Sequence, residues 1–234
     1  SPDGNWILST GYDRSARVWD AQTGGLVMEA SLEAVGLAPA FSPDGNIIVV
    51  GDESGNITMW NISALEARVG FIQFTEFVNK VKFDPQGRWI LVNTDDKNLW
   101  QIPAGQWTTI RDGTLGIKAL SFDELTAQME VSLDAQLVVL SEDHEIGDSM
   151  AILYNRETQV KHFLPHRSKI TGLAISPDSR FLATTNKDNS IVFIWNIETG
   201  ESVQTTSFGE TAFTSAYSPK DPILAIGLTG KTVL

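Results

Sequence analysis

The chain opens with the tetrapeptide SPDG at residues 1–4, and the same four residues return at 42–45. Proline at the second position presets φ, and Asp and Gly suit the remaining positions of a tight turn. Variants recur along the chain as DPQG at 84–87, SLDA at 132–135, SPDS at 176–179 and SPKD at 218–221. Successive turns are 41, 42, 48, 44 and 42 residues apart. Self-similarity at so regular a period predicts a repeat architecture.

Apolar runs and aromatic residues repeat in the same register as the turns. Apolar runs such as IIVVG (47–51), WILVN (89–93) and FLATT (181–185) follow the turns, and a further alternating run then ends at an aromatic residue. Alternation with a period of two indicates β-strands, and no segment keeps the 3.6-residue period of an amphipathic helix. The aromatic residues are Trp19, Trp60, Trp100, Tyr154 and Trp195.

Four short strands in each unit of 40–45 residues are the sequence signature of a β-propeller blade. The sequence therefore predicts an all-β fold of four-stranded antiparallel blades, as one segment over residues 1–234. Repeat boundaries near residues 41, 83, 131, 175 and 217 leave four complete blades and two partial ones. A seven-bladed ring needs roughly 300 residues, so we expect this segment to be part of such a ring in a longer chain.

The turns and aromatic residues resemble those of the WD-repeat family of β-propellers, over essentially the whole chain. In that family a His ten residues before the turn joins a strand Ser or Thr, a turn Asp and the Trp in a hydrogen-bonded tetrad. The resemblance implies this tetrad in the fifth blade alone, from His166, Thr184, Asp188 and Trp195. Elsewhere Leu32, Phe74, Phe122 and Phe208 occupy the position of the His, so we expect aromatic packing to replace the polar network there.

Composition excludes several classes of protein. The chain has no cysteine, which rules out disulfides, thiolate zinc sites and cysteine nucleophiles. Its formal net charge of −12 repels a phosphate backbone, so nucleic acid and anionic membranes are not expected as partners. No apolar run approaches the roughly 18 residues that span a bilayer. We expect a cytoplasmic protein.

Catalytic and metal-binding signals are sparse. No GxSxG motif occurs, the three histidines lie in unrelated contexts, and neither a catalytic centre nor a cofactor is predicted. The loop SEDHEIGD (141–148) offers several carboxylates and one Gly, which suits a calcium ion, but its spacing differs from the twelve-residue calcium loop. Whether this loop binds a cation or is simply solvated stays open.

The resemblance also implies where partners bind. In the family, the loops that join fourth to first strands and second to third strands gather on one face. We expect this face to bind a basic protein through rim charges, so that neutralising Glu142, Asp143 and Glu145 together slows association. The predicted partner-binding residues are Tyr12, Arg14, Glu53, Phe77, Asp95, Asp96, Glu142, Asp143, Glu145, Arg167 and Lys187.

The function that follows is a non-enzymatic protein-interaction scaffold, or the sensor segment of a larger signalling or regulatory protein. The alternative is a propeller enzyme, or a propeller that binds a ligand or metal in its central channel. An enzyme should show polar residues converging from several innermost strands. The predicted innermost strands are instead apolar or small, apart from Asn79, Lys80 and Lys82, which favours the scaffold.

Overall fold

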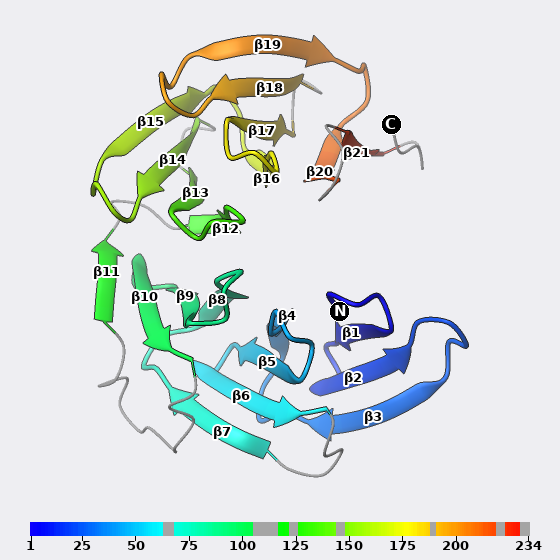
Figure 1. Ribbon diagram of the computed structural model, residues 1–234. Coiled ribbons are helices and arrows are strands. Elements are labelled where there is room, and N and C mark those ends of the chain that lie inside the picture. The colour runs from blue at the N-terminus through cyan, green and yellow to red at the C-terminus, as the bar shows by residue number, and fades with distance from the viewer. Residues whose placement is uncertain are drawn as a thin grey trace. The chain divides into compact units, whose positions relative to one another are not determined.

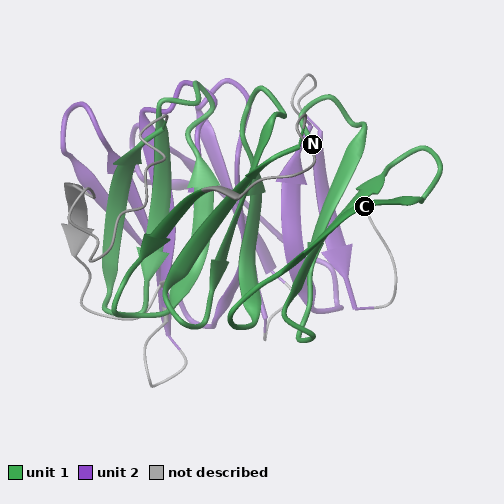
Figure 2. Ribbon diagram, turned by 90° about the horizontal axis from the view of Figure 1, so that it is seen from below, with its two compact units in different colours: residues 1–123 green, residues 124–234 purple. Residues whose placement is uncertain are grey.

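The computed structural model describes residues 1–62, 68–104, 117–121, 126–143, 148–187, 191–218 and 223–229. These residues form β-strands and turns, with no helix among them, and therefore none that is long and apolar enough to cross a membrane. The strands are arranged in six antiparallel sheets (Figure 1). The chain divides into two compact units, residues 1–123 and 124–234, which are described separately (Figure 2).

Unit 1 contains three sheets whose strands pair in chain order. The first sheet consists of β1 (Trp6–Thr10), β2 (Ser15–Asp20) and β3 (Leu26–Ser31). The second consists of β4 (Gly36–Phe41), β5 (Ile47–Asp52), β6 (Asn56–Asn61) and β7 (Arg68–Gln73). The third consists of β8 (Val78–Phe83), β9 (Trp89–Thr94), β10 (Asn98–Pro103) and β11 (Ile117–Ser121).

Unit 2 repeats the arrangement. Its first sheet consists of β12 (Thr126–Val131), β13 (Leu137–Asp143), β14 (Ser149–Asn155) and β15 (Lys161–His166). Its second consists of β16 (Ile170–Ile175), β17 (Phe181–Asn186), β18 (Ile191–Asn196) and β19 (Ser202–Ser207), and its third of β20 (Ala212–Tyr217) and β21 (Leu224–Leu228). Four sheets have four strands and two are partial, which confirms the predicted blades. We number these sheets as blades 1 to 6 in chain order.

The recurring turn folds in the same way in all five blades where it is described. Its fourth residue has a positive φ, between 57° and 76°, and its N–H donates to the carbonyl of the first residue. The Oγ of Ser42 accepts from the Ile47 N–H at 2.9 Å, and Ser176 repeats this bond with Phe181 at 2.9 Å. Left-handed backbone favours glycine, yet only three of the five positions carry it. The fourth residues are Gly4, Gly45, Gly87, Ala135 and Ser179.

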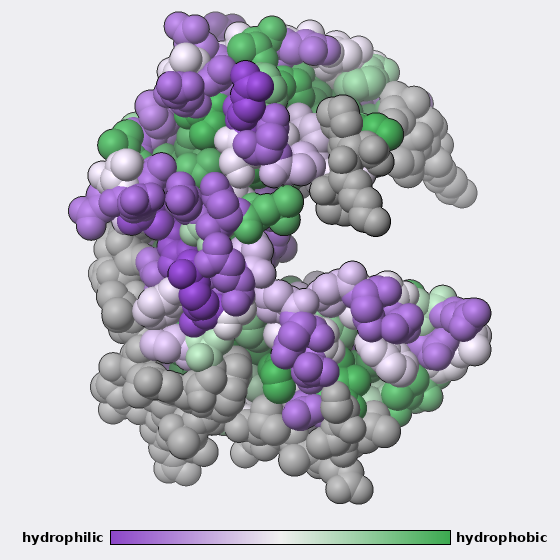
Figure 3. Space-filling view, in the orientation of Figure 1, coloured by the Kyte–Doolittle hydropathy of each residue, from purple (hydrophilic) through white to green (hydrophobic). Residues whose placement is uncertain are grey.

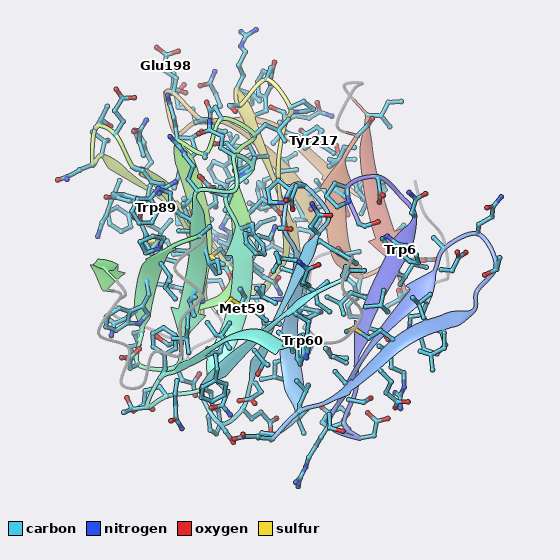
Figure 4. All side chains as sticks on the ribbon, turned by 60° about the horizontal axis from the view of Figure 1, so that its bottom comes forward. Trp6, Met59, Trp60, Trp89, Glu198 and Tyr217 are labelled. Carbon is cyan, nitrogen blue, oxygen red and sulfur yellow. The ribbon has the colours of Figure 1, made fainter. Side chains whose placement is uncertain are left out.

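The core lies between neighbouring sheets, because successive side chains of a strand point to opposite faces. Met59 and Trp60 show this on β6 (Figure 4). Met59 packs in the cluster between blades 2 and 3, with Val78 and Val92. Trp60 packs in the cluster between blades 1 and 2, with Val18. Each sheet of a unit therefore needs its neighbours in order to bury both of its faces.

One aromatic residue of the predicted register is displaced. Trp60 pairs with Ile48 on the adjacent strand, and Trp195 with the equivalent residue Leu182. In blade 3 that place is taken by Ile102, which pairs with Ile90, while Trp100 pairs with Val92, two residues away. The prediction that Trp100 is the repeated aromatic residue is therefore wrong. The equivalent position is two residues further along the strand. Ile102 is 2% exposed and fills the position that Trp occupies in other blades.

Candidate functional site

The loops that join second to third strands, and those that join one blade to the next, lie at the same end of each sheet; we call them the upper loops. In unit 1 they are tied together by backbone hydrogen bonds. The Glu53 N–H donates to the Val35 carbonyl at 3.1 Å, and the Asp95 N–H donates to the Phe77 carbonyl at 3.0 Å. Each bond joins a turn within one blade to the loop that enters that blade.

A third contact joins the β5–β6 turn of blade 2 to the loop that leads from blade 2 into blade 3. The Phe74 N–H donates to the Gly55 carbonyl at 2.8 Å. Gly55 has a φ of 80°, and a Cβ added there would lie 2.4 Å from the Phe74 carbonyl oxygen and 2.6 Å from that of Glu76. Only glycine allows this approach. The upper loops of blades 2 and 3 therefore form one continuous, preorganised surface.

Aromatic side chains project from the upper loops of unit 1. Tyr12 is 88% exposed and Phe77 is 50% exposed, although both are large enough to favour burial. Phe77 is held at its backbone by Asp95, whose own carboxylate accepts a hydrogen bond from Asn79 Nδ2 at 2.8 Å. An exposed aromatic ring on a fixed loop is a typical anchor of a protein interface.

The upper loops of unit 1 also carry several carboxylates. Glu53 and Asp95 are half-buried, and Glu76 and Asp96 are exposed. Asp96 also shapes its turn, because it accepts hydrogen bonds from Thr94 Oγ1 at 2.6 Å and Asn98 Nδ2 at 2.7 Å. Acidic side chains outnumber the basic ones in these loops, so the surface carries negative potential.

The predicted residue Arg14 lies at the edge of this surface. It is exposed and holds the left-handed position of the β1–β2 turn, with a φ of 60°. The neighbouring Asp13 pairs with Arg17, at 2.7 Å between Oδ2 and Nη2. Its hydrogen bond from Ser15, together with Arg17, lowers the pKa of the Asp13 carboxyl.

In unit 2 the predicted rim is only partly on the surface. Arg167 and Lys187 are exposed, and the Lys187 N–H donates to the Lys169 carbonyl at 2.9 Å. Glu142 is 5% exposed, because β13 continues to Asp143 and turns this side chain inward. Its assignment to an exposed acidic loop is therefore wrong. The side chain of Asp143 and all of Glu145 lie outside the described residues.

Three residues of the predicted tetrad are joined by hydrogen bonds: Thr184 and Trp195 belong to blade 5, and His166 lies on β15 of blade 4. The Trp195 indole donates to Thr184 Oγ1 at 3.0 Å, and Thr184 Oγ1 lies 2.7 Å from His166 Nε2. His166 Nδ1 lies 2.8 Å from the Leu164 carbonyl, which can only accept, so the proton is on Nδ1 and Thr184 donates to Nε2. Burial lowers the pKa of His166 to about 4, which favours this neutral form. Asp188 lies outside the described residues.

The other blades keep more of this polar network than expected. Trp19 Nε1 donates to Ser9 Oγ at 2.8 Å, at the position equivalent to Thr184. The displaced Trp100 donates to Thr94 Oγ1 at 3.0 Å and also packs against Phe74, with ring centroids 5.6 Å apart. Aromatic packing therefore accompanies the indole hydrogen bond in blade 3 instead of replacing it.

Two features bear on the alternative of a ligand or metal site. Among the residues that the structure describes, no three His, Asp or Glu side chains are grouped so as to hold a metal ion. Residues 144–147 of the acidic loop are not among them.

On β8, Lys80 is half-buried. Burial is the main cause that lowers the pKa of its amine, and repulsion from Lys82 lowers this pKa further. No other described first strand carries such a pair of lysines.

The blades, their turns and the indole network together define a WD-repeat β-propeller. The family model described as "WD domain, G-beta repeat" matches residues 1–20, 30–61 and 157–196. Hydrazine synthase of Kuenenia stuttgartiensis has a similar fold, with a TM-score of 0.81 at 17% identity over 98% of this chain and 72% of the other. At that identity the likeness concerns the fold alone.

Curated relatives carry the same repeats. Human Pre-mRNA-processing factor 17 is 30% identical over 107 residues, which are 43% of this chain and 18% of that protein. The WD repeat-containing protein 26 homolog of Arabidopsis thaliana is 22% identical over 201 residues, 85% of this chain and 25% of the relative. The chain thus spans a quarter or less of these relatives' length. The chain carries WD repeats, as these relatives do, in a β-propeller fold.

Proposed function

We propose that this chain is a non-enzymatic protein-interaction scaffold, and that the upper loops of unit 1 are its principal binding surface. The observation that carries the proposal is the exposed Phe77 ring, fixed at its backbone by the Asp95 N–H on loops that carry more acidic than basic residues. Rigid exposed aromatic residues supply contact area at small entropic cost, and nearby charges steer the encounter.

The partner on this surface is a protein with a basic contact region. Glu53, Glu76, Asp95 and Asp96 lie on adjoining loops, and Lys97 is the basic residue among them. Nucleic acid is excluded from the proposal because the negative potential repels phosphates. The larger setting we propose is a cytoplasmic regulatory or signalling protein in which this segment supplies the docking surface.

Site-specific photo-cross-linking in the whole protein tests the proposal. A benzophenone amino acid replaces Phe77 in one variant and Phe163 in the other. Phe163 is the matched control, because it is 57% exposed but lies on the outer strand β15. We expect position 77 to capture one protein through a segment rich in Lys and Arg, and position 163 not to capture it. Equal capture at both positions, or an acidic captured segment, contradicts the proposal.

A further inference from the structure

Unit 2 contains a cleft of about 460 Å³ at the end of the sheets opposite the upper loops, between blades 4 and 5. Its floor is apolar and is formed by Leu137, Leu153 and Ile197. Most of the remaining lining is polar. Figure 3 views this end of the sheets, where green apolar atoms of unit 2 lie between purple hydrophilic groups. The volume is within the range of ligand-binding sites.

Two side-chain amides line the cleft, from equivalent turns of blades 4 and 5. Asn155 Oδ1 accepts from the N–H groups of Glu157 and Thr158 at 3.0 and 2.9 Å. Asn196 Oδ1 accepts from the two corresponding N–H groups of its own turn, at 2.9 and 3.0 Å. Each turn therefore uses the oxygen of its Asn, and the Nδ2 groups take no part in these bonds.

Blade 1 shows that the turn itself does not require an amide. There Asp20 Oδ1 accepts from the N–H groups of Gln22 and Thr23 at 2.9 and 2.7 Å. A carboxylate thus closes the turn as well as an amide does. Asn at both cleft positions adds a pair of N–H donors, and these suit the carbonyl groups of an extended peptide.

Charge on the rim favours a basic residue in the ligand. Asp134 and the exposed Glu198 are its acidic members (Figure 4 labels Glu198), and Arg180 is its basic member. Arg180 lies beside Asp178 and over the Phe181 ring, 5.8 Å from the ring centroid. Because its charge is partly balanced there, the carboxylates dominate the rim.

From these contacts we infer that the cleft binds a short extended peptide, which places an aliphatic side chain on the floor and a Lys or Arg beside Glu198. Main-chain carbonyls of the peptide accept from the Asn155 and Asn196 amides. This site is separate from the upper loops of unit 1, and it stands or falls independently of the function proposed for them.

The test uses a phage-displayed random dodecapeptide library, selected on the whole protein. Val160 lines the cleft and is 48% exposed, so that Val160→Trp fills it from the rim. Val203→Trp is the matched control, at a residue that is 54% exposed on β19 and away from the cleft. Glu198→Lys reverses the charge of the rim, and Glu201→Lys makes the same change elsewhere in the same turn.

We expect the selected peptides to share an aliphatic residue followed within two positions by Lys or Arg. Their affinity should fall at least tenfold in Val160→Trp and about fivefold in Glu198→Lys, and should change less than twofold in both controls. No enrichment, an acidic consensus, or equal binding to Val160→Trp overturns the inference. Loss of binding in a Glu53→Gln/Glu76→Gln variant, with Val160→Trp unaffected, assigns the peptides to the upper loops and also overturns it.

Discussion

Thr184 donates a hydrogen bond from β17 to the imidazole of His166 on β15, with 2.7 Å between Oγ1 and Nε2. The bond joins blades 4 and 5, and it requires a neutral imidazole because Nε2 must accept. Protonation of Nε2 removes this acceptor in an environment that excludes water, with the rings of Phe193 and Trp195 both 5.3 Å from the imidazole. The contact between these two blades is therefore linked to pH.

His166→Phe tests this linkage. Burial lowers the folded-state pKa of His166 from 6.5 to about 4, so the unfolded chain takes up the proton first as the pH falls. The contribution of neutral His166 to the free energy of unfolding is fully present above pH 6.5. It is lost on acidification toward pH 4, by about 3 kcal/mol at most. The variant should lose about 1 kcal/mol at pH 7 and depend less on pH. Urea unfolding at pH 7 and pH 5 gives the comparison, and parallel pH profiles would refute it.

Trp195→Phe isolates the indole hydrogen bond. The substitution keeps an aromatic ring in the core but removes the donor to Thr184, so we expect a loss of about 1 kcal/mol. Trp60→Phe is the control, because the residue equivalent to Thr184 in that blade is Val50, which has no hydroxyl. Thermal denaturation compares the two variants. A larger loss at Trp60 than at Trp195 would show that ring volume decides the cost instead of the hydrogen bond.

The recurring turn predicts opposite effects for two reciprocal substitutions. Gly45 and Ala135 occupy the same left-handed position, with φ values of 74° and 60°. Gly45→Ala should destabilise the protein by about 1 kcal/mol, because a Cβ disfavours this backbone conformation. Ala135→Gly removes the same strain and should be neutral or up to about 1 kcal/mol more stable. Chemical denaturation measures both, and a stabilising Gly45→Ala would contradict the turn assignment.

Blade 3 carries a less favourable form of this turn. Asp84 is fully buried; its Oδ1 accepts from two backbone N–H groups, while Oδ2 has no hydrogen bond and lies 3.6 Å from Arg88 Nε. Asp84→Ser with Gln86→Asp recreates the turn of blades 2 and 5. We expect a gain of about 1 kcal/mol, because a buried charged oxygen is removed. Gln86→Asp alone is the control, and a double variant less stable than the wild type would be inconsistent with this account.

Much of the fold was predictable because its determinants are local. A left-handed turn position, a Pro that presets φ and strands of period two leave a signature at every repeat. The sequence pattern places Trp100 in the wrong register because the same face of a strand returns every second residue, so a shift by two preserves the pattern. Only the pairing with Val92 distinguishes the two registers.

The binding surfaces were less predictable than the blades. Carboxylates favour solvent, so the sequence predicts a loop at Glu142, but β13 continues through this residue and its pairing with Met150 fixes its face. The cleft between blades 4 and 5 left no signal in the sequence. Its floor combines residues of β13 and β14 with Ile197, which follows β18, and only the packing of two sheets brings them together.

Binding of a basic protein to the upper loops of unit 1 can be measured as the association rate constant for the protein captured at position 77, at two salt concentrations. Glu53→Gln with Glu76→Gln should slow association several-fold at low salt, and the effect should diminish as salt rises. Glu157→Gln with Glu201→Gln removes two exposed carboxylates from the opposite end of the sheets in unit 2 and should leave the rate unchanged. Equal rates for the two double variants, or a rate independent of salt, would show that these loops do not bind the captured protein through their carboxylates.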